Sequence, residues 1–376
     1  MTNLTNARIV LPGGVATGTL HIDGGRLAAP SAGPGPGSGP GETVDLGGRH
    51  VVPGFVDMHV HGGAGASYQT GRPEEAERAA RFHLAHGTTT TVASLVTGTP
   101  DELANAVSGL ADLAADGLIA GVHLEGPYLA RDRCGAHDPD LLRHPDRAEF
   151  ARLVRLGRGR LRMITLAPEL PGALDLVRDA VDAGVLAAVG HTDAPGATAR
   201  AAFDAGATVA THLFNAMRPL HHREGGPVAA ALNDPRVTAE LINDGVHVEG
   251  TVGRLAFRAA PGRVALITDA MAAAGVGDGD YRLGVMDVQV RDGRATLAGG
   301  TSIAGSTITM ADAFRRAVAV LGLPIEEAAV AASLIPARAL GLDSRVGSLE
   351  PGKDADLVVL NDDMSVHRVM KAGRWV

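Results

Sequence analysis

Between residues 52 and 345, short apolar runs rich in β-branched side chains alternate with Ala-rich segments. The Ala-rich segments predict helices, most clearly over residues 73–85, 100–115 and 172–183. The apolar runs predict eight strands, over residues 52–60, 88–96, 118–124, 162–167, 186–191, 208–214, 238–242 and 264–268. Eight alternating units over roughly 290 residues fit an α/β fold with a parallel (β/α)8 TIM-like barrel better than a doubly wound sheet. Further helices are expected over residues 311–319 and 325–340, packed outside the barrel.

Both chain ends have a different pattern, with short strand-like runs separated by glycine turns. These runs cover residues 8–11, 19–22, 356–360, 366–370 and 374–376. They predict a small β-sandwich domain built from both ends, residues 1–51 and 346–376, around a catalytic barrel at 52–345. Residues 30–41, PSAGPGPGSGPG, are expected to form a surface loop with neither helix nor strand.

Composition narrows the possible partners and the compartment. A net charge of −8 and only 11 aromatic residues (one Trp, three Tyr, seven Phe) argue against a nucleic-acid partner. No apolar stretch is long enough to span a membrane, and the first ten residues do not resemble a signal peptide. A single cysteine, Cys134, cannot form an internal disulfide. We therefore expect a cytoplasmic protein with neither a membrane nor a nucleic-acid partner.

Nearly every predicted strand ends in an imidazole or a carboxylate, and strand C-terminal ends carry the active site in barrels of this kind. These residues are His59, His61, Glu125, His191, His212, His247 and Asp269. His59 and His61 stand two apart on one strand, so both point to the same face. Alone, such a pair also suits two hydrogen-bonded histidines near a strand end. Together with the other strand-end residues, it predicts a site for zinc or a similar divalent cation.

Several of these residues have two possible interpretations. Glu125 precedes Gly-Pro, where a carboxylate either caps a helix or binds a metal ion. Many two-metal barrel hydrolases bridge their ions with a carboxylated lysine, but this chain has only two lysines, both after residue 350. If two ions bind, a carboxylate must therefore bridge them, and Glu125 is best placed. Asp269 could carry a proton to and from a water molecule, or it could cap the start of the following Ala-rich segment. His247 suits a buried core histidine or a substrate contact. Arg223 lies in a predicted loop that either binds an anion or faces solvent.

Longer motifs resemble known enzymes. PGFVDMHVHG and LEPGKDADLVVL are similar to motifs of the amidohydrolase superfamily, whose members are metal-dependent barrel hydrolases. Within it, HLEGPYL, GHTDA, THLFNAM, DGVHVEG and TDAMAAAG resemble the N-acetylglucosamine-6-phosphate deacetylase family, in order from about residue 50 to residue 360. HLEGP and THLFNAM are the more specific of these motifs.

The resemblance implies a role for each matching residue. Glu125, His191 and His212 would bind the principal ion, and His59 and His61 a second ion bridged by Glu125. Asp269 would be the catalytic acid and base. The residues implied in substrate contact are Ala136, Asn215, Ala216, Arg223, His247 and Ile303. Arg223 would bind the 6-phosphate, across a homodimer interface. Cys134 stands where the family commonly has a basic residue.

The expected reaction is hydrolysis of N-acetylglucosamine 6-phosphate to glucosamine 6-phosphate and acetate, in amino-sugar catabolism and cell-wall recycling. The expected cofactor is one or two divalent cations per subunit, zinc first. Two alternatives remain at this point. One is an amidohydrolase acting on an N-acyl amino acid or a cyclic amide, and the other is a non-catalytic sensor of amino-sugar phosphates.

Overall fold

A computed structural model describes residues 1–29, 31–32 and 41–376 of the chain. The chain divides into two compact units. One comprises Met1–Asp57, His83–Thr90 and Met310–Val376, and the other comprises Met58–Phe82 and Thr91–Thr309. The predicted domain boundaries, with the barrel at residues 52–345, stay a prediction.

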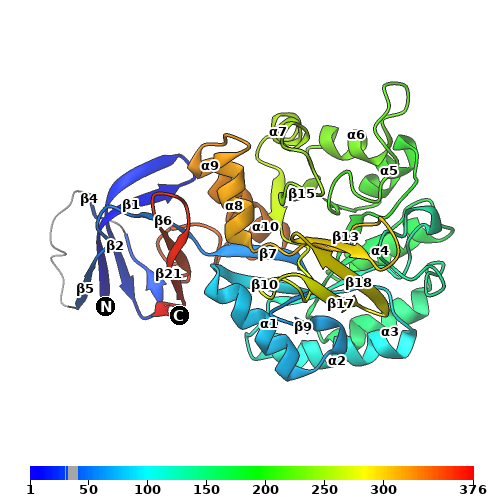
Figure 1. Cartoon of the computed structure of the whole chain (residues 1–376), viewed down its shortest axis with the longest axis horizontal. Helices are drawn as coiled ribbons and strands as arrows, with labels where there is room; N and C mark the ends of the chain where they lie inside the picture. Colours follow the sequence, from blue (N-terminus) through cyan, green and yellow to red (C-terminus); the bar gives the residue numbers. More distant parts are fainter. Residues whose placement is uncertain (30, 33–40) are drawn as a thin grey trace. The chain divides into compact units, whose positions relative to one another are not determined.

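Eight parallel strands form the central sheet, which confirms the predicted α/β barrel fold (Figure 1). In sheet order they are β16 (Val264–Ile267), β15 (Thr238–Ile242), β14 (Val209–Ala210), β13 (Leu186–Val189), β12 (Leu161–Leu166), β11 (Gly121–Glu125), β10 (Thr88–Leu95) and β7 (Phe55–Val60). Backbone hydrogen bonds close the ring after β16. Asp269 N donates to His59 O at 2.9 Å, and His61 N donates to Ala270 O at 2.8 Å. Because these strands are covered on both sides, they read as continuous apolar runs.

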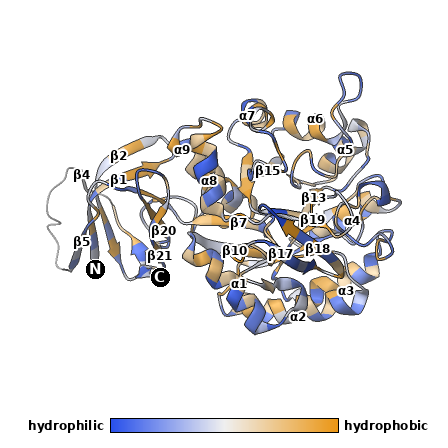
Figure 2. Ribbon diagram, viewed as in Figure 1, coloured by the Kyte–Doolittle hydropathy of each residue, from blue (hydrophilic) through white to orange (hydrophobic). Residues whose placement is uncertain are grey.

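Helices follow most of the barrel strands. They are α1 (Pro73–Ala85), α2 (Pro100–Ala115), α3 (Arg147–Gly157), α4 (Ala173–Asp182), α5 (Gly196–Asp204), α6 (Gly226–Asn233) and α7 (Gly250–Ala259). The predicted bounds of α1 and α2 are confirmed to the residue. At the start of α2, Thr99 and Glu102 form a capping box, in which each side chain accepts a hydrogen bond from the backbone of the other residue. Helices α1 to α3 carry both hydrophilic and hydrophobic residues (Figure 2), as expected for amphipathic helices that cover a barrel.

Both chain ends contribute to one mixed sheet in the first unit. Its strands are β22 (Arg374–Trp375), β21 (Val366–Lys371), β20 (Leu357–Leu360), β6 (His50–Pro53), β1 (Thr2–Leu11), β2 (Gly14–Asp23) and β3 (Arg26–Leu27), with β4 (Ser31–Ala32) on β2 and β5 (Glu42–Asp45) on β1. Its buried apolar cluster includes Leu4 and Val51 from one end and Leu357 and Met370 from the other. The sheet therefore needs both ends of the chain. The same unit contains α8 (Met310–Ala319), α9 (Ile325–Ala329), a π-helical turn η3 (Val330–Leu334) and α10 (Ile335–Ala339).

Two strand predictions were wrong. The run over residues 52–60 is two strands, because β6 pairs with β1 and β20 whereas β7 joins the barrel sheet. Hydropathy is continuous across Gly54, where a Cβ atom would lie 2.2 Å from Thr89 Oγ1, so only packing marks the break. Within residues 30–41, Ser31–Ala32 pairs with β2, since a Pro- and Gly-rich composition does not prevent a short backbone pairing at a sheet edge. Residues 30 and 33–40 lie outside the described residues.

The sequence patterns did not predict a small three-stranded antiparallel sheet that follows the barrel. It consists of β17 (Gly279–Leu283), β18 (Met286–Arg291) and β19 (Arg294–Leu297). Its inner residues Leu283, Val288 and Val290 pack in a cluster with Val96 and Ala136. Among the described helices, none is long and apolar enough to cross a membrane.

Candidate active site

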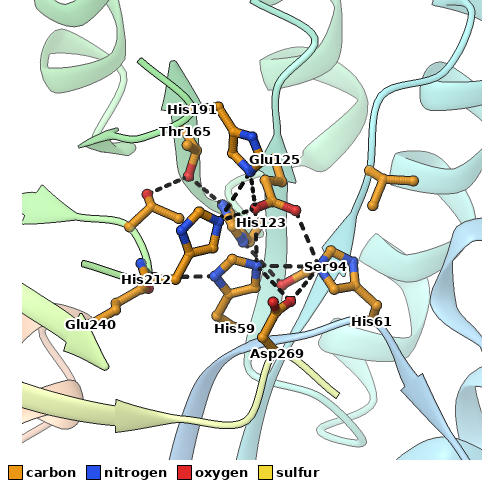
Figure 3. Close-up of polar contacts among 12 residues, drawn as sticks. His59, His61, Ser94, His123, Glu125, Thr165, His191, His212, Glu240 and Asp269 are labelled. Carbon is orange, nitrogen blue, oxygen red and sulfur yellow. Dashed lines mark hydrogen bonds and ion pairs between the residues drawn. The ribbon is translucent and has the colours of Figure 1, made fainter. Parts of the chain in front are cut away.

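Six polar side chains meet where barrel strands end (Figure 3). They are His59 and His61 from β7, Glu125 from the end of β11, and His191, His212 and Asp269, each two residues beyond β13, β14 and β16. His191, His212 and Asp269 have φ angles of 46°, 27° and 50°. Such left-handed backbone ends an extended strand, and it explains why β14 is much shorter than the predicted strand over residues 208–214. All six side chains are buried.

Glu125 and two histidines form the first group. Its Oε1 atom lies 3.0 Å from His191 Nε2 and 2.9 Å from His212 Nε2. The two imidazole Nε2 atoms are 3.0 Å apart. The three side chains therefore bring their ligand atoms together, and they are the residues that the family resemblance assigns to the principal ion. That assignment stays a prediction.

His59, His61 and Asp269 form the second group. The Nε2 atoms of His59 and His61 are 3.2 Å apart, and Asp269 Oδ1 lies 3.1 Å from His61 Nε2. Glu125 also reaches this group, because its Oε2 atom is 3.2 Å from His61 Nε2. One carboxylate thus touches both groups, as expected of a bridging ligand.

Each group suits a divalent cation. Within each, the ligand atoms all lie within 4.8 Å of one another. Nitrogens bound at about 2.0–2.1 Å to a tetrahedral zinc ion lie roughly 3.3 Å apart, close to the spacings seen here. Among the described residues, neither Glu125 nor Asp269 forms an ion pair with an arginine or a lysine. Buried carboxylates need a compensating positive charge, and a metal ion would supply it.

The sequence patterns missed three neighbours of these groups. Glu240 in β15 accepts a hydrogen bond from His59 Nδ1 at 3.1 Å. His137 Nδ1 accepts a hydrogen bond from the backbone N–H of Thr97 at 3.2 Å. The proton of the His137 ring therefore lies on Nε2, which faces Glu125 Oε2 at 3.3 Å. His123 sits edge-on to His59, with ring centroids 4.6 Å apart. Glu240 interrupts the apolar run TAELI, which is the one sequence signal that marks it.

Charge coupling sets the protonation of the ion-free site. Burial opposes the charged form of His61, but hydrogen bonds to Asp269 and Glu125 outweigh it and raise its pKa to about 9. Burial likewise opposes ionisation of Asp269, but the charge of His59 and the hydrogen bond to His61 lower its pKa to about 2. For His137, burial dominates and lowers the pKa to about 4 despite Glu125. At neutral pH the ion-free site therefore holds ionised carboxylates and at least one protonated imidazole.

Metal binding to the ion-free protein is expected to release at least one proton per chain at pH 7, because ligand imidazoles must be neutral and nearby carboxylates raise the pKa values of both His59 and His61 despite their burial. His61 is protonated below its pKa of about 9, so apparent affinity should rise between pH 7 and pH 9. Calorimetric titration with Zn²⁺ in two buffers of different ionisation enthalpy measures the release. A proton count of zero at pH 7, with affinity flat up to pH 9, would contradict this prediction.

A cavity of about 390 Å³ opens above the two groups. Five of the six residues predicted to contact substrate line it, namely Ala136, Asn215, Ala216, His247 and Ile303. His247 is held by Asp244, whose Oδ2 atom lies 2.6 Å from His247 Nδ1. Arg223 does not line the cavity and instead lies exposed, 2.8 Å from His222. Its predicted phosphate contact therefore requires a second subunit or a movement of its loop.

Two other arginines line the cavity. Arg133 is held by Asp193, at 2.7 Å. Arg294, from β19, is exposed at the cavity wall. Sequence reasoning named neither. For Arg294 the reason is that the small sheet that carries it was not predicted.

Comparisons with known proteins show the family of this chain. The amidohydrolase family matches residues 50–376. An N-acetylgalactosamine-6-phosphate deacetylase of Escherichia coli O157:H7 is 38% identical over 86% of this chain and 87% of its own. The N-acetylglucosamine-6-phosphate deacetylase of Bos taurus is 35% identical over 99% of this chain and 94% of its own. A solved mutant of N-acetyl-D-glucosamine-6-phosphate deacetylase from Mycobacterium smegmatis, in complex with N-acetyl-D-glucosamine-6-phosphate, is 48% identical, with a TM-score of 0.95 and coverage of 100% of this chain and 98% of its own.

Proposed function

Because this chain belongs to the amidohydrolase family and, within it, to the N-acetylglucosamine-6-phosphate deacetylases, we propose that it hydrolyses N-acetylglucosamine 6-phosphate to glucosamine 6-phosphate and acetate. The observation that carries this proposal is the pair of buried histidine and carboxylate groups at the floor of the cavity. A sensor would need only to bind the sugar phosphate, and it gains nothing from such a costly buried cluster. The motif resemblance and the comparisons point to the same family.

We assign the principal ion to Glu125, His191 and His212, and a second ion to His59 and His61 with Glu125 between them. Zn²⁺ is our first choice, since imidazole and carboxylate ligands suit it. When bound, such an ion polarises the acetyl carbonyl and makes a water molecule acidic enough to attack at neutral pH.

Asp269 is our proposed proton carrier. Its carboxylate is ionised at neutral pH, because its pKa in the ion-free site is about 2. It can therefore accept the proton of the attacking water and then deliver it to the leaving amine of the sugar. Its backbone is fixed on both sides, since Asp269 N donates to His59 O at 2.9 Å and Ser306 N donates to Asp269 O at 2.7 Å. This fixed position suits a group that must face both water and amine.

The cavity lining supports a sugar-phosphate substrate. We propose that His247, oriented by Asp244, contacts the sugar or the carbonyl oxygen. Asn215, Ala216, Ala136 and Ile303 would contact the sugar ring and its substituents. Arg223 would reach the 6-phosphate from the partner of a homodimer, because guanidinium groups recognise phosphate oxygens well. The single cysteine and the family suggest a cytoplasmic location.

Acetate release by the purified, metal-loaded protein tests the proposed reaction. N-acetylglucosamine 6-phosphate is compared with unphosphorylated N-acetylglucosamine and with N-acetylgalactosamine 6-phosphate. We expect strong preference for the first. A preference for the galactosamine compound would move this chain toward the Escherichia coli O157:H7 relative named above, and activity that ignores the phosphate would contradict the proposal.

Arg223→Ala is expected to raise KM for N-acetylglucosamine 6-phosphate about 10- to 100-fold with little change in kcat, since a charged hydrogen bond is worth about 1.5–3 kcal/mol. Steady-state kinetics measure both constants. Arg81→Ala removes an exposed arginine of α1 that pairs with Glu77, and it is the matched control. An unchanged KM in Arg223→Ala would contradict the phosphate contact, and the same loss in Arg294→Ala would assign it to Arg294.

A further inference from the structure

Glu240 lies fully buried in β15, close to both groups. Its Oε2 atom lies 3.1 Å from His59 Nδ1, and the His212 backbone N–H donates to the same oxygen at 3.2 Å (Figure 3). In the part of the chain that the structure describes, His59 is its sole ion-pair partner. We infer that Glu240 is a positioning residue that directs His59 toward a metal ion and so controls binding of the second ion. This inference rests on the metal site of the proposed function.

The hydrogen bond to Glu240 fixes which nitrogen of His59 faces the second group. A carboxylate accepts hydrogen bonds, so the proton of a neutral His59 lies on Nδ1. The lone pair then lies on Nε2, which points at His61 Nε2 at 3.2 Å and Asp269 Oδ1 at 3.5 Å. A carboxylate partner also makes the imidazole a stronger ligand.

Among the described residues, no carboxylate lies against Nδ1 of the other three histidines of the two groups, which are His61, His191 and His212. His191 Nδ1 lies 2.8 Å from the Arg133 backbone carbonyl. The buried Nδ1 atoms of His61 and His212 have no hydrogen-bond partner within the described parts of the chain. The orienting charge is therefore specific to His59, which belongs to the second group. Loss of Glu240 should affect the second ion more than the ion held by Glu125, His191 and His212.

Glu240 also touches the backbone of the first group. His212 has a φ of 27°, a strained angle for a residue with a side chain. Its N–H donates to the Glu240 carboxylate, and Leu213 N donates to the Glu240 carbonyl at 2.8 Å. One residue of β15 thus holds His59 by its ring and His212 by its backbone.

Burial makes an ordinary structural role a poor explanation. A fully buried carboxylate is costly unless positive charge offsets it. Replacement by the isosteric glutamine keeps the shape, and His59 can lose its proton when the carboxylate charge is gone, so the variant should still fold. A purely structural carboxylate would then leave ion binding unchanged. Glutamine also presents an NH₂ group, which permits the wrong His59 tautomer. The inference therefore predicts weaker ion binding without loss of the fold.

The test compares wild type, Glu240→Gln and Glu149→Gln. Glu149 is a largely buried carboxylate of the same unit, paired with Arg143 away from the cavity. Each protein is stripped of metal and titrated with Zn²⁺, and bound ions per chain are measured by elemental analysis. Thermal melting of the ion-free proteins reports on the fold, and Co²⁺ absorption spectra report on ligand geometry.

We expect two ions in wild type and in Glu149→Gln. Glu240→Gln should bind one ion normally and the other about 10- to 100-fold more weakly. Its ion-free form should stay folded and melt cooperatively. Its Co²⁺ spectrum should differ from wild type. Glu240→Asp, which keeps the charge one methylene further away, should bind the second ion more tightly than Glu240→Gln.

Three results would overturn the inference. They are wild-type binding of both ions by Glu240→Gln, equal weakening of both ions together with a lower melting temperature, and a wild-type protein that binds fewer than two ions. The proposed function fails separately, if metal-loaded wild type releases no acetate from N-acetylglucosamine 6-phosphate. If wild type is active and Glu240→Gln binds both ions normally, only the inference about Glu240 is wrong.

Discussion

Asp269→Asn is expected to lower kcat for acetate release about 10²- to 10⁴-fold, the usual contribution of a positioned proton carrier. Asparagine has nearly the same shape but cannot take up the proton. It also tolerates the left-handed backbone that Asp269 adopts, with φ of 50°, so the loop beyond β16 should stay in place. Since the other residues that line the cavity are untouched, KM should change little.

Metal content must be measured on the same variant, because Asp269 lies 3.1 Å from His61 Nε2 within the second group. Loss of an ion together with activity would make Asp269 mainly a ligand rather than a proton carrier. Asp101→Asn, an exposed aspartate of α2 paired with Arg152, is the control and should keep wild-type kcat. A kcat within tenfold of wild type in Asp269→Asn would place the proton acceptor elsewhere, with His247 the next candidate in the cavity.

Glu125→Gln is expected to abolish tight metal binding and acetate release together. Glu125 lies within 3.3 Å of imidazole nitrogens of His61, His137, His191 and His212. Replacing one oxygen by NH₂ removes both the charge and a lone pair that the two groups share. The loss should exceed the about 10- to 100-fold cost of removing an outer partner of a metal ligand.

Equilibrium dialysis against Zn²⁺, followed by elemental analysis, measures this effect of Glu125→Gln. Glu149→Gln makes the same chemical change at a carboxylate remote from the cavity, and it should retain both ions. Full ion content in Glu125→Gln would show that the histidines suffice without it. That outcome would remove Glu125 as the bridging group.

The site's histidines and acids were predictable because each marks the end of an apolar run. In a barrel, the C-terminal ends of all strands face the same side, so residues at these ends converge although they are far apart in sequence. His59 and Asp269 are an example, 210 positions apart in the chain yet 3.5 Å apart at their polar atoms. The motif resemblance then placed the chain in its family, and the comparisons confirm that assignment.

Other parts of the site have no local signature. The small sheet β17–β19 forms a wall of the cavity. The alternation of polar and apolar residues in its strands is typical of a half-buried strand, but it does not indicate that they border the site. Glu240 is a single acidic residue in an apolar strand, and its partner His59 lies 181 positions away. The backbone at the left-handed turns of His191 and His212 is hydrogen-bonded to distant segments, because Ala130 N donates to His191 O and His212 N donates to Glu240 Oε2. None of these features follows from residues that are neighbours in sequence.

By itself, the sequence determined the alternation of strands and helices in the barrel, the β-sheet built from both chain ends and the six polar residues at strand ends, because hydropathy and strand ends are local properties. Only the tertiary structure decided where the run over residues 52–60 divides between two sheets. It also decided which carboxylate faces His59 Nδ1, and that Arg223 lies outside the cavity of its own chain. These outcomes depend on packing between segments far apart in the chain, where distance and shape rather than residue type choose the partner.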